Sequence, residues 1–434
     1  MTLKDSFCPS PWFHMRINNL GHYEYCRWAD KTNRNAGPNI RDMLPIEYFQ
    51  NYAGQVRQEL LAGQRPVGCR ECYEMEGHEK ISGRQRQLLK AGVTDNHFEK
   101  TMLSSPWVNA WAASVATGNT DQTPQDWQID LGGYCNSACV FCSPASSTRL
   151  AREWKKIGFI QDLPPVSWAD DPQQVQRLLE SLLACPTLKY LHFIGGETLI
   201  TPAFVQILKS LIEAGRTEAV IGFTTNLTVW DQEVIDLLSK FDGVNLGMSV
   251  EALTPVNDYV RWPARLPTIT ENLERWRQQA ESRGWLLQLR TTPTVLTIHD
   301  LVSVYDYAWQ HNISVESCNF FNEPAYMRPA VLPAQMREPI IDVMQSWIDQ
   351  HPADSLDTVN VRDPNRARAY IRADLQSYVN YFTNEPDQSH RLQDLMLFIE
   401  KLELSRDNCI LDYIPQYEQL FRSAGYAALA RRCL

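Results

Sequence analysis

Three cysteines fall within one eight-residue stretch, in the order Cys135-x3-Cys139-x2-Cys142. They follow residues 127–131, whose alternating apolar side chains predict a strand. A loop that leaves a strand can fold three thiolates around one inorganic centre. Structural zinc sites usually draw on two matching cysteine pairs, whereas three thiolates leave one position of a tetrahedral centre open. The spacing therefore favours an iron–sulfur site with one open coordination position.

A second set of four cysteines precedes this loop in the chain. Cys8 and Cys26 stand at the two ends of a predicted β-hairpin that turns at residues 18–21, and Cys69 and Cys72 form a Cys-x2-Cys pair. Four thiolates complete a tetrahedral ligand set, which suits either zinc or a second iron–sulfur cluster. Because a full ligand set leaves no open position, this site is expected to transfer electrons or to support the fold.

Length, charge and cysteine usage narrow the class of protein. A chain of 434 residues exceeds one average domain and suggests two or three. A net charge of -10 disfavours a nucleic-acid partner. Seven of the 11 cysteines fall in the two clusters, which favours metal ligation in a reducing, cytoplasmic setting over disulfides. The sequence shows no signal peptide and no apolar run of membrane-spanning length, so no membrane partner is expected.

Strand-like and helix-like stretches alternate through the central part of the chain. The six predicted strands are residues 127–131, 188–194, 219–224, 244–250, 285–291 and 313–320. Repeated βα units predict an α/β fold with a parallel sheet, and six of them suggest a partial (β/α)6 TIM-like barrel. The active site of such a barrel lies at the carboxyl ends of its strands, which is where the three-cysteine loop falls.

The predicted domains follow from these patterns. Residues 1–100 are expected to form a small α+β module, in which residues 46–62 have the spacing of one helix. Residues 101–126 are expected to be a connection and residues 127–325 the barrel. Residues 326–434 are expected to form a mainly helical region that covers the barrel.

The three-cysteine motif resembles the signature of the radical S-adenosylmethionine (SAM) superfamily, which has an aromatic residue before the last cysteine, here Phe141. The resemblance implies that Cys135, Cys139 and Cys142 hold a 4Fe–4S cluster and that SAM binds the open iron. It also implies reductive cleavage of SAM to a 5′-deoxyadenosyl radical, which abstracts hydrogen from a substrate. Phe141 would pack near the adenine of SAM. The protein's task would be to position the cofactors and shield the radical.

A Gly195-Gly196-Glu197 sequence follows the second predicted strand and resembles the family's Gly-Gly-Glu motif. Two glycines allow close approach of the backbone, and the resemblance implies that the carboxylate of Glu197 accepts the SAM ammonium group. Taken without the resemblance, the same residues also fit a tight turn with a capping glutamate.

Polar residues follow the third and fourth predicted strands. The resemblance implies that Ser249 binds the ribose or carboxylate of SAM, and it extends this role more loosely to Asn226 and Glu251. Arg261 matches an arginine common after this strand and would pair with the SAM carboxylate. A surface salt bridge is the alternative interpretation of Arg261.

The N-terminal segment resembles the auxiliary-cluster module of the twitch or SPASM type, placed before the barrel. The resemblance rests on Phe7-Cys8-Pro-x-Pro-Trp12, the hairpin, Cys69-x2-Cys72-x3-Glu76 and Ser82-x-Arg84. It implies an auxiliary 4Fe–4S cluster on Cys8, Cys26, Cys69 and Cys72, in preference to zinc. The sequence departs from the pattern at Arg27, where a second cysteine is expected.

These features predict a radical SAM enzyme. Because relatives with auxiliary clusters often cross-link or epimerise ribosomally made peptides, the resemblance implies such a peptide as the substrate. A small-molecule reaction on a sugar or nucleoside is the alternative substrate class. A non-catalytic iron–sulfur or zinc protein is the alternative from another class. The expected partners are the substrate and an electron donor such as flavodoxin or ferredoxin. No residue is assigned as a catalytic acid or base.

Overall fold

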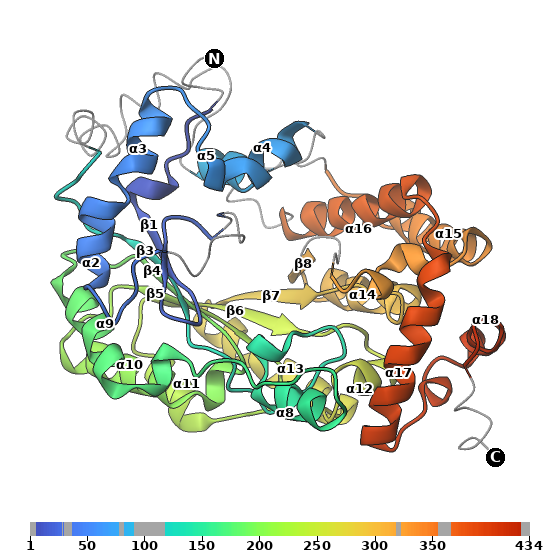
Figure 1. Cartoon of the computed structure of the whole chain (residues 1–434). Helices are drawn as coiled ribbons and strands as arrows, with labels where there is room; N and C mark the ends of the chain where they lie inside the picture. The colour runs from blue at the N-terminus through green and yellow to red at the C-terminus, as the bar shows by residue number, and fades with distance from the viewer. Residues whose placement is uncertain are drawn as a thin grey trace. The chain divides into compact units, whose positions relative to one another are not determined.

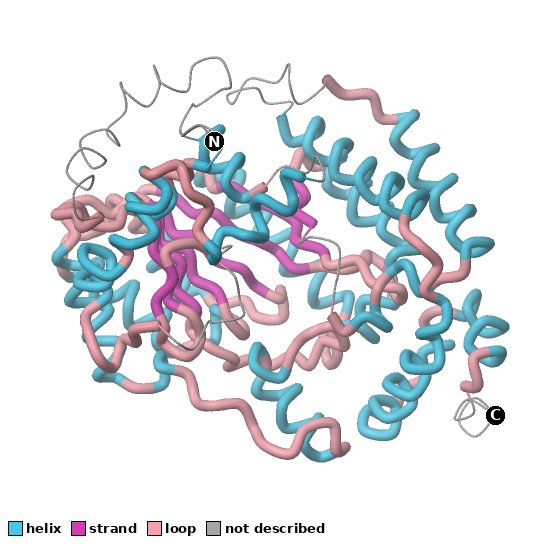
Figure 2. The backbone as a smooth tube through the Cα atoms, turned by 45° about the horizontal axis from the view of Figure 1, so that its top comes forward, coloured by secondary structure: helices cyan, strands magenta, loops and turns pink. Residues whose placement is uncertain are grey.

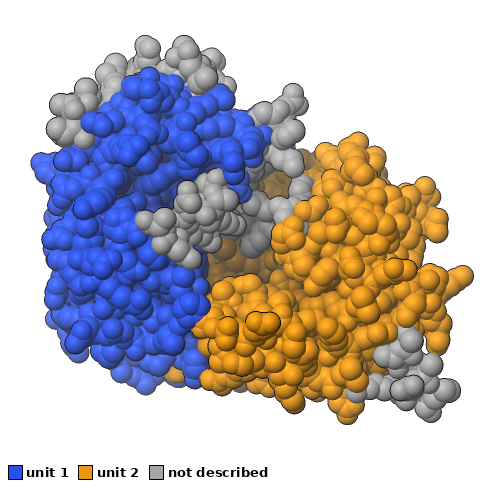
Figure 3. Space-filling view, viewed as in Figure 1, with its two compact units in different colours: residues 1–134, 165–223, 232–244 blue, residues 135–164, 224–231, 245–434 orange. Residues whose placement is uncertain are grey.

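The computed structural model describes residues 6–27, 29, 37–77, 82–90, 118–317, 323–354 and 366–426. The chain divides into two compact units, shown in separate colours in Figure 3. Unit 1 comprises residues 1–134, 165–223 and 232–244, and unit 2 comprises residues 135–164, 224–231 and 245–434. Most of the predicted connection, residues 101–117, lies outside the described residues, and the three predicted domain boundaries stay predictions.

Strands and helices alternate along the chain, as Figure 2 shows by colour. The strands are β1 (His14–Ile17), β2 (Tyr23–Glu24), β3 (Asp126–Asp130), β4 (Tyr190–Ile194), β5 (Val220–Thr225), β6 (Gly243–Ser249), β7 (Leu286–Thr291) and β8 (Ser314–Ser317). The helices between them are α8 (Thr148–Lys156), α9 (Pro172–Ala184), α10 (Pro202–Glu213), α11 (Gln232–Leu238), α12 (Val256–Val260), α13 (Leu266–Arg283) and α14 (Leu301–Gln310). The six βα repeats from β3 to β8 confirm the predicted α/β fold and are consistent with a partial TIM-like barrel.

Within unit 1 the strands run in the order β2-β1-β3-β4-β5. The hairpin of β1 and β2 is antiparallel, as predicted, and β1 then pairs in parallel with β3, so that His14 lies opposite Asp126. The parallel pairing continues from β3 to β4 and from β4 to β5. The N-terminal hairpin therefore extends the same sheet that carries the first barrel strand.

One face of these strands is apolar and packs against helices, with α9 and α10 alongside (Figure 1). Trp127 and Ile129 of β3 are fully buried. The rings of Phe193 in β4 and Phe223 in β5 lie 5.0 and 5.5 Å from the ring of Phe204 in α10. Alternate residues of each strand point to this face, so burying them anchors α10 on the sheet.

The opposite face of the same strands is polar. His14 and Arg16 of β1 and Gln128 of β3 are buried there, and Gln128 lies in register with both Arg16 and His192 of β4. The imidazole Nδ1 of His14 lies 3.1 Å from Oδ1 of Asp126. Burial lowers the pKa of His14, although the Asp126 carboxylate opposes that shift.

The helices of the N-terminal segment are shorter than predicted. Where one helix was expected over residues 46–62, the chain forms α2 (Pro45–Glu47), a π-helical turn (Tyr48–Tyr52) and α3 (Gly54–Leu61). The break brings Gly54 against the backbone of Gly118, where a Cβ atom would lie 3.1 Å from the Gly118 carbonyl carbon. Two further helices, α4 (Arg70–Gly77) and α5 (Gly83–Lys90), follow.

Unit 2 carries the parallel strands β6, β7 and β8 together with the C-terminal helices. These are α15 (Ala334–Gln350), α16 (Arg366–Asn384), α17 (Leu392–Arg406) and α18 (Glu418–Ser423), in agreement with the predicted helical region. Tyr305 of α14 donates a hydrogen bond to Asp374 of α16, and the rings of Trp309 and Trp347 lie 5.6 Å apart between α14 and α15. Among the described residues, no helix combines the length and apolarity that crossing a bilayer requires.

Candidate functional site

The three-cysteine loop is held along its backbone by the segment that ends α12. The amide of Ala138 donates to the carbonyl of Trp262 at 2.7 Å, and the amide of Val140 donates to the carbonyl of Val260 at 2.8 Å. These two bonds flank Cys139 on either side. The loop thus behaves like a strand paired to residues 260–262, which fixes the direction of the Cys139 side chain.

The side chain of Asn226, which directly follows β5, forms hydrogen bonds with three consecutive residues of this loop. Its amide Nδ2 donates to Oδ1 of Asn136 at 2.8 Å and to Oγ of Ser137 at 3.1 Å, and lies 3.9 Å from the sulfur of Cys135. Its Oδ1 accepts from the backbone amide of Thr228 at 3.0 Å. Asn226 is thus hydrogen-bonded to the cysteine loop, and its predicted contact with SAM stays a prediction.

The sulfur environment fits an anionic metal-binding group. The backbone amide of Ser137 points at the sulfur of Cys135 across 3.4 Å, which together with Asn226 gives that sulfur two N–H donors. Burial and the neighbouring Cys139 and Cys135 raise the pKa of Cys142 to about 12. Metal binding at such thiols must displace their protons, and N–H donors to sulfur stabilise the thiolate that results.

Glu251 and Arg261 lie beside the loop and pair with each other. The guanidinium Nη1 of Arg261 donates to Oε1 of Glu251 at 2.7 Å, and both side chains are buried. The other oxygen of Glu251 accepts from the backbone amide of Thr292 at 2.5 Å. Arg261 lies 5.9 Å from the centre of the Phe141 ring, and its Nε has no hydrogen-bond partner among the described residues. Arg261 is therefore not a surface salt bridge, which was the alternative interpretation.

The Gly195-Gly196-Glu197 turn belongs to unit 1. Gly196 adopts φ +47°, and a Cβ atom there would lie 2.1 Å from the carbonyl oxygen of Tyr134, the residue before Cys135. The amide of Glu197 donates to the same carbonyl at 2.9 Å. Oε1 of Glu197 accepts from the amide of Leu199 at 3.2 Å, so this glutamate caps the short helix that follows. Its predicted contact with SAM stays a prediction, as does that of the half-buried Ser249.

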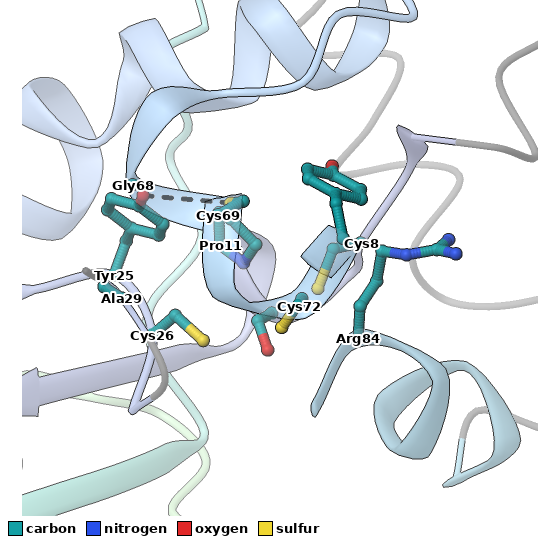
Figure 4. Close-up of a pocket in the computed structure, with 11 residues that line it drawn as sticks. Cys8, Pro11, Tyr25, Cys26, Ala29, Gly68, Cys69, Cys72 and Arg84 are labelled. Atoms are coloured by element: carbon teal, nitrogen blue, oxygen red, sulfur yellow. Dashed lines mark hydrogen bonds between the residues drawn. The ribbon is translucent and has the colours of Figure 1, made fainter. Parts of the chain in front are cut away.

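The four N-terminal cysteines line one cavity of unit 1, of about 360 Å³ including its open side (Figure 4). Cys26 and Cys72 turn their sulfur atoms toward this space from different elements (Figure 4). Burial raises the pKa of Cys8 and of Cys69 to about 12, and nearby thiols add to both shifts. No three His, Cys, Asp or Glu side chains in the described part of the chain are grouped around a point that would hold a single metal ion. The cavity nonetheless offers four sulfur donors, the ligand type that iron–sulfur clusters take.

The other residues of the N-terminal motif, Glu76, Ser82 and Arg84, connect the segments that line this cavity. Glu76 of α4 accepts from Nε of Arg84 at 2.9 Å and also from the hydroxyl of Ser82. Nη1 of Arg84 reaches the carbonyl of Phe7 at 3.1 Å, directly before Cys8. The spacing of Glu76, Ser82 and Arg84 thus ties α4, which carries Cys72, to the segment that carries Cys8.

Arg27 stands where a further cysteine was expected and serves the sheet. Its Nη2 lies 3.6 Å from Oδ1 of Asp126 in β3, and its carbonyl accepts from Nη1 of Arg16 in β1 at 3.4 Å. Arg27, the residue after Cys26, therefore contacts the polar residues of β1 and β3.

One functional candidate was missed by the sequence. Arg406, in the last turn of α17, donates to the carbonyl of Ala138 between two of the loop cysteines at 2.7 Å. Its Nε and Nη2 also donate to the carboxylate of Glu153 in α8 at 2.8 and 2.6 Å. An isolated arginine near the C-terminal end of a helix carries no local signal of such a role, because basic residues are common there.

A family model described as the radical SAM superfamily matches residues 129–287. No curated protein matches the chain. Among solved structures, SuiB of Streptococcus suis bound to S-adenosylmethionine is 14% identical over 77% of this chain and 69% of that chain, with a TM-score of 0.34. The enzyme anSMEcpe with bound AdoMet is 15% identical over 51% and 60%, with a TM-score of 0.37. The radical SAM methyltransferase TsrM from Kitasatospora setae is 18% identical over 44% and 35%, with a TM-score of 0.30.

Proposed function

We propose that this chain, in which a model of the radical SAM superfamily matches residues 129–287, cleaves SAM reductively and abstracts hydrogen from a ribosomally made peptide. The observation that carries the proposal is the three-cysteine loop, in which Cys135 receives two N–H donors and Cys139 is fixed from both sides. Cys135, Cys139 and Cys142 would hold a 4Fe–4S cluster. When bound, that cluster supplies the electron for SAM cleavage.

The chain's own residues would bind and orient SAM around this loop. Arg261 presents a buried Nε donor beside Phe141, which suits a carboxylate near an aromatic ring. Phe141 would contact the adenine, and Ser249 and the Gly195-Gly196-Glu197 turn would contact the remaining polar groups of SAM. Glu251 would act through Arg261, because its carboxylate is already engaged by Arg261 and Thr292.

We further infer that the cavity lined by Cys8, Cys26, Cys69 and Cys72 holds an auxiliary 4Fe–4S cluster. The support for this assignment is its four sulfur donors. The other polar side chains of its described lining carry hydroxyl or guanidinium groups, which are poor ligands beside thiolates. Such a site would pass electrons or support the fold. An electron donor such as flavodoxin or ferredoxin would serve the enzyme.

Peptide modification is the proposed reaction class because the combined domain and four-cysteine cavity resemble radical SAM enzymes with auxiliary clusters, which often act on such peptides. Cross-linking and epimerisation both begin with hydrogen abstraction from the peptide. A sugar or nucleoside substrate is the competing outcome that the experiment below separates.

The test starts from protein purified without oxygen. Two clusters predict about eight iron atoms per chain. Cys135→Ala should abolish 5′-deoxyadenosine formation from SAM under reductant, whereas Cys26→Ala should lower iron to about four per chain and leave that formation measurable. Zinc in place of iron, or unchanged 5′-deoxyadenosine from Cys135→Ala, would refute the proposal.

The substrate class is tested with deuterium. A peptide substrate labelled at Cα or Cβ should pass deuterium into 5′-deoxyadenosine, and the peptide should change in mass or in stereochemistry. Labelled sugars and nucleosides serve as the matched alternative. Transfer from one of these, and none from peptides, would overturn the peptide assignment while leaving SAM cleavage intact.

A further inference from the structure

Arg406 makes a contact inside the cysteine loop that the proposed function does not use. The residue lies on α17, and its side chain is 1% exposed. It donates through Nη2 to the carbonyl of Ala138, the residue directly before Cys139. The amide of Ala138 is held in turn by the carbonyl of Trp262 at 2.7 Å. Both polar groups of this residue are therefore fixed by groups from outside the loop.

The guanidinium itself is fixed by two further contacts. Its fork binds both oxygens of Glu153 in α8, whose side chain is 7% exposed. Its plane lies over the ring of Trp262, with a distance of 5.0 Å to the ring centre. A bidentate pair and a ring contact orient the guanidinium in a way that a lysine ammonium group would not reproduce.

A second residue of α17 acts on the same part of the chain. Glu403, one helical turn before Arg406, accepts from the hydroxyl of Tyr259 in α12 at 3.4 Å and from the amide of Ile410 at 2.6 Å. Residues 260 and 262, which pair with the cysteine loop, directly follow Tyr259. Helix α17 therefore holds the loop directly through Arg406 and holds its pairing segment through Glu403.

The charge of Arg406 is buried next to the cysteine loop. Its guanidinium donates to the carbonyl of Ala138, one residue before Cys139, and pairs with the carboxylate of Glu153. A buried positive charge near a cluster favours the more negative, reduced state of that cluster, because Coulomb energies are large where water is excluded.

We propose that Arg406 is a positioning residue for the SAM-binding cluster, which fixes the Ala138–Cys139 peptide and raises the reduction potential of the cluster. This inference rests on the proposed function, since it requires a cluster at Cys135, Cys139 and Cys142. It assigns part of the cofactor site to the C-terminal helical region, outside the residues that match the radical SAM family.

The test compares variants in the reconstituted enzyme. Arg406→Gln removes the positive charge and leaves the Glu153 carboxylate in place. The expected result is a lower midpoint potential of the SAM-responsive cluster in a redox titration followed by electron paramagnetic resonance, and faster loss of iron to a chelator. Arg406→Lys keeps the charge but loses the fork, so its potential should stay near wild type while iron loss quickens.

Arg337 provides a matched control. It is also a buried arginine of unit 2, and it donates to the carbonyls of Leu332 at 2.7 Å and Glu385 at 2.8 Å, both of which lie outside the cysteine loop. Arg337→Gln should lower the thermal midpoint as the Arg406 variants do, but leave the potential and the iron loss rate unchanged. If all the variants match Arg337→Gln, Arg406 only supports the fold and the inference is overturned. If wild-type protein shows no SAM-responsive cluster, the proposed function itself fails.

Discussion

Glu251 and Arg261 form a buried ion pair of 2.7 Å, one at the end of the fourth barrel strand and the other after α12. Sequence reasoning assigned each of them separately to SAM. In the structure their charges neutralise each other, and the backbone amide of Thr292 satisfies the second oxygen of Glu251. Burial raises the pKa of Glu251, an effect that Arg261 counteracts. The two side chains predicted to bind SAM are therefore also a buried ion pair inside unit 2.

Breaking this pair on one side should destabilise the protein strongly. Arg261→Gln leaves a buried carboxylate without its cation, and we expect the free energy of unfolding to fall by about 3 kcal/mol or more. Glu251→Gln should cost a similar amount, whereas the double variant should cost less than the sum of the two. Urea denaturation of the metal-free protein measures all three. Strict additivity would show that the two charges do not interact.

Removing the Asn226 side chain should release the cysteine loop. Asn226→Ala deletes the donor to Asn136, Ser137 and the Cys135 sulfur, and three lost hydrogen bonds cost about 2–3 kcal/mol in total. Asn226→Asp should lower iron content after reconstitution further, because a carboxylate repels the thiolate. Asn380→Ala removes an exposed amide of α16 and is the control. Wild-type iron content in both Asn226 variants would contradict the positioning role.

A methyl group at Gly196 should disrupt the turn before the first cysteine. The added Cβ would lie 2.1 Å from the Tyr134 carbonyl oxygen, and φ +47° is unfavourable for alanine. Gly215→Ala is the matched control, because Gly215 has φ +68° but no atom within 4 Å of an added Cβ. We expect the control to cost about 1 kcal/mol for the backbone alone and Gly196→Ala about 3 kcal/mol or more. Equal urea midpoints for the two variants would be inconsistent with the close approach.

His299 should make stability depend on pH. Burial lowers its pKa from 6.5 to about 4, and its ring contacts Tyr417 at 5.3 Å. Between these two pKa values the unfolded chain binds a proton that the folded chain does not, so the stability present above pH 6.5 falls as the pH drops toward 4. The loss is on the order of 3 kcal/mol. His299→Gln should flatten this part of the stability curve measured by urea denaturation, and an unchanged curve would refute the assignment.

Local patterns were sufficient for the main features of the fold. The six βα repeats, the N-terminal hairpin and the C-terminal helices follow from apolar periodicity and turn residues, which act over a few positions. The prediction of one continuous helix over residues 46–62 was wrong, because the segment forms two short helices separated by a π-helical turn. The segment after the break is held by Arg57, whose guanidinium donates to the carbonyls of Pro11 and Gly118, partners 46 and 61 residues away.

The candidate site divides in the same way. Thiol chemistry and spacing identify the seven cysteines and the glycine turn from the sequence, because a cluster ligand and a positive φ each need a particular residue type. The partners of Glu251, Asn226 and Arg406 follow from tertiary packing alone. Arg406 meets Glu153 across 253 positions of the chain, and buried charges choose their partners by the packing that brings them together. The sequence determined which thiols are available as candidate metal ligands, and the folded chain determined which side chains hold the segment that carries them.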